Sequence, residues 1–200
     1  MEPLITDDIF AAYLNCETKA QLIATDTPLP PHQIHDWQVR LAADYKSECR
    51  TRLLSANRDH LCCDGTPSVG DLLRHTYKLV LNCTIGDSTL QAHVDALQLS
   101  PAGLTQTTCI PVLIVPHDTV THADKLLLAF DALALVAIFG IPSPRGQILH
   151  GVTTCHLGKP GAVAPNCAPV RFRNLQPIDA STRSPIEPTL HRMCLRIAMS

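Results

Sequence analysis

The stretch Leu90-Gln-Ala-His-Val-Asp-Ala-Leu97 decides the fold, together with Ala123-Asp-Lys-Leu-Leu-Leu-Ala-Phe-Asp-Ala-Leu133. The first predicts a strand that carries a single carboxylate, Asp95, among mostly apolar or neutral residues. The second predicts the beginning of a buried helix with Lys125 in its first turn. A strand with one carboxylate, followed by another strand and then this helix, is the arrangement from which the rest of the prediction is built.

Asp95 is the main candidate for a functional side chain. Because side chains alternate faces along a strand, we expect His93, Asp95 and Leu97 to share one side of the sheet. A buried carboxylate is costly unless it is paired or bound to a cation. Two interpretations therefore stay open for Asp95: a ligand of a hard divalent cation such as Mg²⁺, or the partner of a nearby Lys or Arg.

The order of the expected elements predicts an α/β protein with a mixed central sheet of about four strands flanked by helices. A helical crossover after the third strand should return the chain to a parallel neighbour. Gly86-Asp87-Ser88 indicates a hairpin, and Pro111 indicates an edge or bulge in the third strand. In chain order we expect helices at 7–23 and 32–56, a short helix after Ser68, strands at 77–85, 89–97 and 109–115, a helix at 121–139 and a strand at 147–152.

Composition fits one domain with an appendage. The 200 residues are 46% hydrophobic and 17% charged, and the formal net charge is −2, so no overall basic field indicates nucleic acid. The longest apolar stretch, 126–141, is too short for a membrane span, and the acidic N-terminus does not resemble an export signal. We therefore expect a cytoplasmic protein with no membrane association.

The last quarter of the chain differs from the rest. We place a core domain at 1–152 and a proline-rich, irregular or disordered tail at 153–200. The nine cysteines are scattered, odd in number and without a Cys-x-x-Cys pair, so a disulfide framework is not expected.

Lys125 and His32 are weaker candidates. A lysine in the first turn of a helix opposes the helix dipole, but a bound phosphate would find both its ammonium and free backbone N–H groups there. A solvated charge is the alternative for Lys125. His32 and His35 lie three residues apart on one helical face and could serve as acid/base or ligand, although histidine is also a common surface residue.

Several blocks, in order, resemble RecB-like nucleases of the PD-(D/E)XK superfamily, which are related to CRISPR-associated iron–sulfur nucleases. The resemblance runs from about residue 4 to about residue 151. The blocks are Ile5-Thr-Asp-Asp-Ile-Phe-Ala-Ala-Tyr-Leu-Asn-Cys-Glu-Thr-Lys-Ala20, His32-Gln-Ile-His-Asp-Trp-Gln38, His93-Val-Asp-Ala-Leu97 and Asp124-Lys-Leu-Leu-Leu-Ala-Phe-Asp-Ala-Leu133.

The resemblance implies a restriction-endonuclease-like core, a DNA substrate and Mg²⁺ or Mn²⁺ at Asp95, with His32 as a helper. The third strand lacks the acid and lysine that such enzymes carry there. Asp118 is the nearest acid and our second expected metal ligand, and we hypothesise that Lys125 replaces the missing lysine.

The resemblance also implies an iron–sulfur cluster. Cys16 matches its first cysteine, but Cys194 alone lies where three others should cluster. We therefore expect the cluster to be incomplete in this chain and the gene to be truncated or frameshifted beyond about residue 156.

Three functions follow from these observations. The first is a metal-dependent DNA nuclease, weak or inactive because its catalytic set is incomplete. The second is a non-catalytic remnant of the nuclease fold that binds nucleic acid or protein. The third is a purely structural product of a broken gene.

Overall fold

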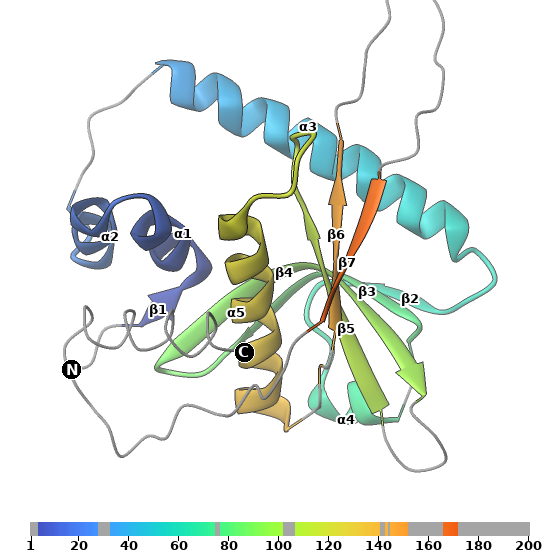
Figure 1. Ribbon diagram of the computed structural model, residues 1–200. Coiled ribbons are helices and arrows are strands. Elements are labelled where there is room, and N and C mark those ends of the chain that lie inside the picture. The colour runs from blue at the N-terminus through green and yellow to red at the C-terminus, as the bar shows by residue number, and fades with distance from the viewer. Residues whose placement is uncertain are drawn as a thin grey trace, which may run out of the picture.

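The chain forms a mixed seven-stranded sheet packed against helices, as a computed structural model shows (Figure 1). The structure describes residues 4–27, 33–74, 77–101, 107–140, 143, 145–151 and 166–171. The α/β class is therefore confirmed, and the prediction of about four strands was too low.

The bounds of the elements agree with the sequence for most of the core. The helices are α1 Asp7–Asn15, α2 Glu17–Ala24, α3 Gln33–Ala56, α4 Val69–Leu73 and α5 His122–Phe139. The strands are β1 Ile5–Thr6, β2 Cys62–Asp64, β3 Leu79–Gly86, β4 Leu90–Pro101, β5 Thr107–Ile114, β6 Arg145–His150 and β7 Asn166–Arg171.

The sheet has the strand order β2-β3-β4-β5-β6-β7, and β1 pairs with β4 outside this path. The strands β3, β4 and β5 form an antiparallel meander, and α5 leads to β6, which runs parallel to β5 as predicted. Three strands were not predicted. β1 has two residues, β2 lies in a polar segment, and β7 lies where an irregular tail was expected.

Two faces of the sheet carry different helices. Buried residues of α1 and α5 pack against one face together with Val80, Val94 and Leu97. On the opposite face, α3 packs through Tyr45 and Cys49. The two sides are called the α5 face and the α3 face below.

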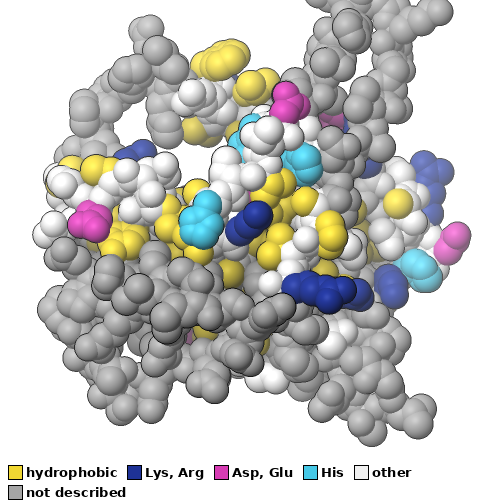
Figure 2. Space-filling view, viewed as in Figure 1, with side chains coloured by type: hydrophobic (Ala, Val, Ile, Leu, Met, Phe, Trp, Pro, Cys, Tyr) yellow, Lys and Arg dark blue, Asp and Glu magenta, His cyan; other side chains and the backbone are white. Residues whose placement is uncertain are grey.

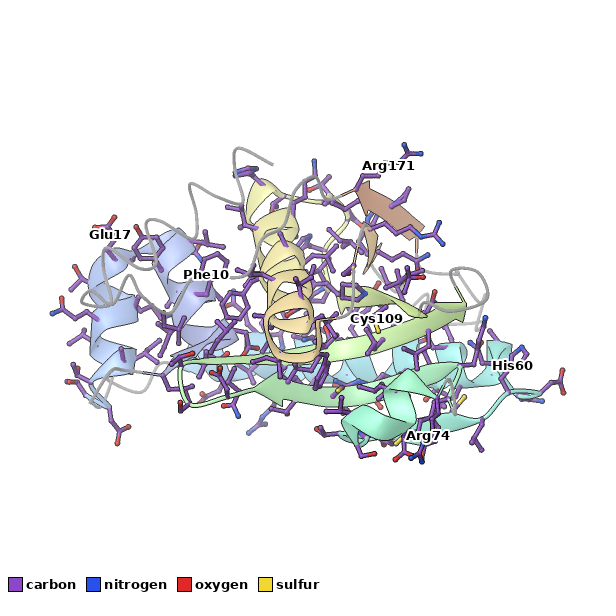
Figure 3. The ribbon with its side chains drawn as sticks, turned by 90° about the horizontal axis from the view of Figure 1, so that it is seen from below. Phe10, Glu17, His60, Arg74, Cys109 and Arg171 are labelled. Carbon is purple, nitrogen blue, oxygen red and sulfur yellow. The ribbon has the colours of Figure 1, made fainter. Side chains whose placement is uncertain are left out.

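The helices α1 and α5 are joined by a stacked aromatic pair. The ring centroids of Phe10 and Phe130 lie 4.9 Å apart, and neither side chain is accessible to solvent. Figure 3 shows Phe10 between the two helices. This pair fixes the N-terminal helix beside α5, and β1, which leads into that helix, pairs with the first two residues of β4.

Local signals explain where the helices begin and end. Thr121 caps α5 with a reciprocal capping box to Asp124, and Gly140 ends it in the left-handed conformation. The single helix expected at 7–23 is instead two helices, because Cys16 adopts an extended backbone between them. No helix among the described residues is long and apolar enough to span a membrane.

The contact between α5 and β6 gives a test of the packing. A Cβ atom on Gly146 would lie 2.8–3.0 Å from three side-chain atoms of Leu128, which is fully buried. We expect Gly146→Ala to lower the free energy of unfolding by about 1–3 kcal/mol in urea denaturation, because the fully buried Leu128 side chain would have to shift to admit the methyl group.

Gly70 in α4 is the matched control for this substitution. Its Cβ would meet only the Ser68 hydroxyl, at 3.7 Å. Gly70→Ala should therefore be neutral or slightly stabilising. Equal losses in both variants would contradict the packing described here.

Candidate functional site

Asp95 is buried, and both oxygens of its carboxylate accept hydrogen bonds. One oxygen, Oδ1, accepts hydrogen bonds from Lys46 Nζ at 2.8 Å and from an Arg50 Nη at 3.3 Å. The other, Oδ2, accepts the backbone N–H of Ile114 at 2.9 Å. The side chain of Asp95 is only 1% exposed, so these donors replace the water that it loses on folding.

The site lies where the strand that pairs with β4 changes from β1 to β5. On the edge opposite β3, β4 pairs with β1 at Leu90 and Gln91 and with β5 from Ala96 onward. Asp95 immediately precedes the first β5 pair, and it binds a backbone N–H near the end of β5. The carboxylate thus joins β4, β5 and α3 at the point where the sheet divides.

The strand does not alternate regularly at this point, which corrects one prediction. Leu97 packs on the α5 face, whereas Asp95 contacts two residues of α3. Val94 lies on the α5 face and Ala96 on the α3 face, although they are two positions apart. His93, Asp95 and Leu97 therefore do not share one side.

Two further carboxylates lie within electrostatic reach of this group: Asp131 interacts with Asp95, and Asp7 interacts with Lys46. Burial raises the pKa of Asp131 on α5 well above its usual range, and the charges of Asp95 and Asp7 raise it further, against the opposing effect of Lys46. Burial and the neighbouring Asp8 likewise raise the pKa of Asp7. The Asp131 carboxyl is thereby favoured in its neutral, protonated form.

The two cations are only partly buried. The side chains of Lys46 and Arg50 are 32% and 24% exposed, so each reaches from the carboxylate toward solvent. Arg50 Nε is buried and has no hydrogen-bond partner, and the same is true of the Tyr45 hydroxyl. Two positive charges against one negative leave this group with a net charge of +1.

Lys46 and Arg50 were not predicted as site residues. They lie 49 and 45 positions from Asp95 in the sequence, so no local pattern connects them to it. Their spacing of four residues places both on one side of α3, which is the only signal that could have suggested a joint role. Lys46 is the lysine that contacts Asp95.

The predicted residues Lys125 and Asp118 lie around the N-terminal end of α5. Lys125 is exposed in the first turn of the helix, and Asp118 is exposed on the preceding loop, where its carbonyl oxygen faces His150 Nδ1 at 2.9 Å. His117 pairs with Asp124 at 3.3 Å in the same region. Figure 2 shows histidine side chains gathered around this end of α5.

Part of the predicted catalytic, metal and cluster set lies outside the residues that the structure describes. His32 and Cys194 lie outside the described residues, and Cys16 is an exposed thiol between α1 and α2. Within the described part of the chain, no three His, Cys, Asp or Glu side chains form a group that could hold a metal ion. At Asp95 the two oxygens accept three N–H donors, so a divalent cation at this place would compete with Lys46 and Arg50 for the carboxylate.

Comparisons with known proteins give a structural likeness and no family. No protein-family model matches the sequence, and no curated protein matches it. One solved structure, described as the crystal structure of SSO0001, matches with a TM-score of 0.41 and 11% sequence identity. The match covers 100% of this chain and 77% of that chain.

The buried Asp131 makes stability depend on pH. Because its pKa is higher in the folded than in the unfolded protein, its contribution to stability falls as pH rises above about 4, until the folded-state pKa is passed. We expect Asp131→Asn to raise the free energy of unfolding at pH 7 relative to the unsubstituted protein. The gain should grow by at most about 1.4 kcal/mol per pH unit across this window.

Urea denaturation at pH 4, 5, 6 and 7 measures this difference. Asp124→Asn is the control, because Asp124 is a second buried acid of α5 whose carboxylate accepts the N–H and the hydroxyl of Thr121. That substitution should destabilise the protein at pH 7. A gain for Asp131→Asn that does not change with pH would contradict the assignment of a raised pKa.

Proposed function

We propose that this protein binds DNA through a nuclease-type α/β core, with Lys46 and Arg50 contacting backbone phosphate and Asp95 holding them in place. The proposal rests on the contacts of Asp95, whose carboxylate accepts hydrogen bonds from Lys46, from Arg50 and from the Ile114 N–H. A carboxylate held in this way acts as an anchor for positive charge. The proposal is the non-catalytic binding function predicted from the sequence, with the contacts named.

Donor capacity supports a phosphate contact at this place. An ammonium carries three N–H donors and a guanidinium five, and Lys46 and Arg50 each give one of them to Asp95. Both side chains keep part of their surface in solvent, and the group has a net charge of +1. Phosphate oxygens are strong acceptors for such cations, and contacts of this kind supply most of the affinity of sequence-independent DNA binding.

The position of the two cations also reduces the entropic cost of binding. A lysine on a free surface helix loses rotamer freedom when it binds phosphate, at a cost of up to about 2 kcal/mol. Lys46 is already restrained by its 2.8 Å contact with Asp95. The anchor therefore orders the cation before DNA arrives, so that a larger part of the contact contributes to affinity.

A metal-dependent DNA nuclease is the second candidate, with Mg²⁺ or Mn²⁺ as the expected ion. It is favoured by the order of β3, β4, β5, α5 and β6 and by a carboxylate on the middle strand of the meander, close to a lysine. The contacts of Asp95 oppose it, because a cation bound at Oδ1 would compete with both Lys46 and Arg50. An iron–sulfur cluster at Cys16 and Cys194 remains part of this candidate alone.

DNA binding in the presence of EDTA tests the proposal. We expect fluorescence anisotropy with a labelled duplex and a labelled single strand to show binding without divalent metal. Lys46→Met and Arg50→Met should each weaken it, and each should reduce the slope of log affinity against log salt concentration by about 1. Lys125→Met is the matched control, since Lys125 is exposed on α5 and should leave the slope unchanged.

Asp95→Asn separates the two candidates. The amide oxygen of asparagine can still accept hydrogen bonds from Lys46 and Arg50, and the net charge of the group rises from +1 to +2, so in EDTA the folded variant should still bind DNA. Cleavage that needs Mg²⁺ or Mn²⁺ and is lost in Asp95→Asn would instead establish the nuclease. Absence of binding in EDTA, or binding that neither Lys46→Met nor Arg50→Met changes, would reject the phosphate contact.

A further inference from the structure

Asn82 occupies an unusual place in β3, directly across from Asp95. The ladder between β3 and β4 pairs Leu81 with Ala96 and Cys83 with Val94, and the two residues between these pairs are Asn82 and Asp95. The backbone of Asn82 has φ 50°, in the left-handed region, which is rare within a strand.

In both strands the alternation of side chains between the two faces of the sheet shifts by one residue at this position. In β3, Leu81 packs on the α3 face and Cys83 on the α5 face, although regular alternation would place them on the same face. In β4, Val94 and Ala96 are divided in the same way. Leu90, Ala92 and Val94 lie on the α5 face, which leaves Asp95 on the α3 face, yet Leu97 and Leu99 also lie on the α5 face. With regular alternation Asp95 and Leu97 would share a face, so either Asp95 would point away from Lys46 or Leu97 and Leu99 would leave the α5 face.

The segment after β2 supports the irregular backbone on the other edge of β3. Gly65 N–H donates to the Leu81 carbonyl at 2.8 Å, just before the change of phase. Thr66 Oγ1 accepts the Thr84 N–H at 2.9 Å and lies 3.2 Å from the Thr84 carbonyl, just after it. These contacts satisfy backbone groups that a regular ladder would otherwise pair.

The side chain of Asn82 is tied to the same segment. Its Nδ2 donates to Asp64 Oδ1 at 2.7 Å. Asparagine tolerates the left-handed conformation better than other residues with a side chain, glycine excepted, because its short polar group bonds locally. The residue type, the backbone angle and the tie to Asp64 therefore all favour the phase change.

We propose that Asn82 is a positioning residue for Asp95: its left-handed backbone breaks the alternation, so that Asp95 meets Lys46 and Arg50 on the α3 face while Leu97 and Leu99 stay on the α5 face. The inference concerns the site of the proposed function, but the contact between Asp95 and Lys46 tests it whether or not DNA binds. A β-branched residue disfavours positive φ and should restore regular alternation. Glycine adopts positive φ without steric cost and should preserve the site.

The experiment is a double-mutant cycle in urea denaturation, with Lys46→Met and Asp95→Asn combined in four backgrounds: the unsubstituted protein, Asn82→Gly, Asn82→Val and Asp64→Ala. The coupling between Lys46 and Asp95 should be the same in Asn82→Gly as in the unsubstituted protein and should be lost in Asn82→Val. If Asn82→Val does not fold, Asn82→Ala takes its place, because alanine also disfavours φ 50° but adds little bulk. Asp64→Ala, which removes the tie alone, should weaken the coupling less than either.

Anisotropy with the labelled duplex in EDTA gives the second readout on the same variants. Asn82→Gly should bind as the unsubstituted protein does, and Asn82→Val or Asn82→Ala should lose the contribution of Lys46. A residue with a merely structural role would lower overall stability and leave the coupling unchanged, and that result would overturn the inference. Loss of coupling without any DNA binding would uphold the role of Asn82 and reject the proposed function.

Discussion

The buried carboxylate of Asp95 is the constraint on which the arrangement of this protein depends. It connects β4 with β5 through the Ile114 N–H and connects both strands with α3 through Lys46 and Arg50. Removing one partner of a buried ion pair costs about 3–5 kcal/mol, whereas exposed pairs contribute at most about 1 kcal/mol. Asp95 is 1% exposed and its cations are 24–32% exposed, so this group lies between a buried and an exposed ion pair. The carboxylate is the buried member, and it is the one that would be costly to leave without a partner.

The same carboxylate sets the electrostatics around it. Asp131 lies behind the sheet on α5, in the field of Asp95 and Asp7, and its pKa is raised well above the usual range. Asp95 has two cations within hydrogen-bond distance, while burial and its acidic neighbours favour the neutral form of Asp131. Such a division of charge between neighbouring carboxyl groups follows from which of them has a cation within hydrogen-bond distance.

Sequence predicts the elements whose signals are local. The helix α5 was expected at 121–139 because Thr121 and Gly140 mark its ends, and the hairpin of β3 and β4 was expected from strand-forming residues on either side of a turn at Asp87. What sequence could not predict depends on distant or irregular contacts. The roles of Lys46 and Arg50 require α3 to cross the sheet, and the placement of Asp95 and Leu97 on opposite faces requires the break in alternation beside Asn82. β2 and β7 exist only because a neighbouring strand supplies their hydrogen bonds.

The distance along the chain between α3 and Asp95 has a consequence for the order of folding. β3 and β4 are joined by a short turn and can pair within microseconds, whereas Lys46 must close a loop of 49 positions to reach its partner. The hairpin is therefore expected to form first, with its carboxylate still hydrated. Apolar segments that collapse onto this surface without bringing a cation would bury a bare charge. We therefore expect Asp95 to disfavour the docking of helices that bring no cation and to favour the docking of α3, which carries Lys46 and Arg50 four residues apart.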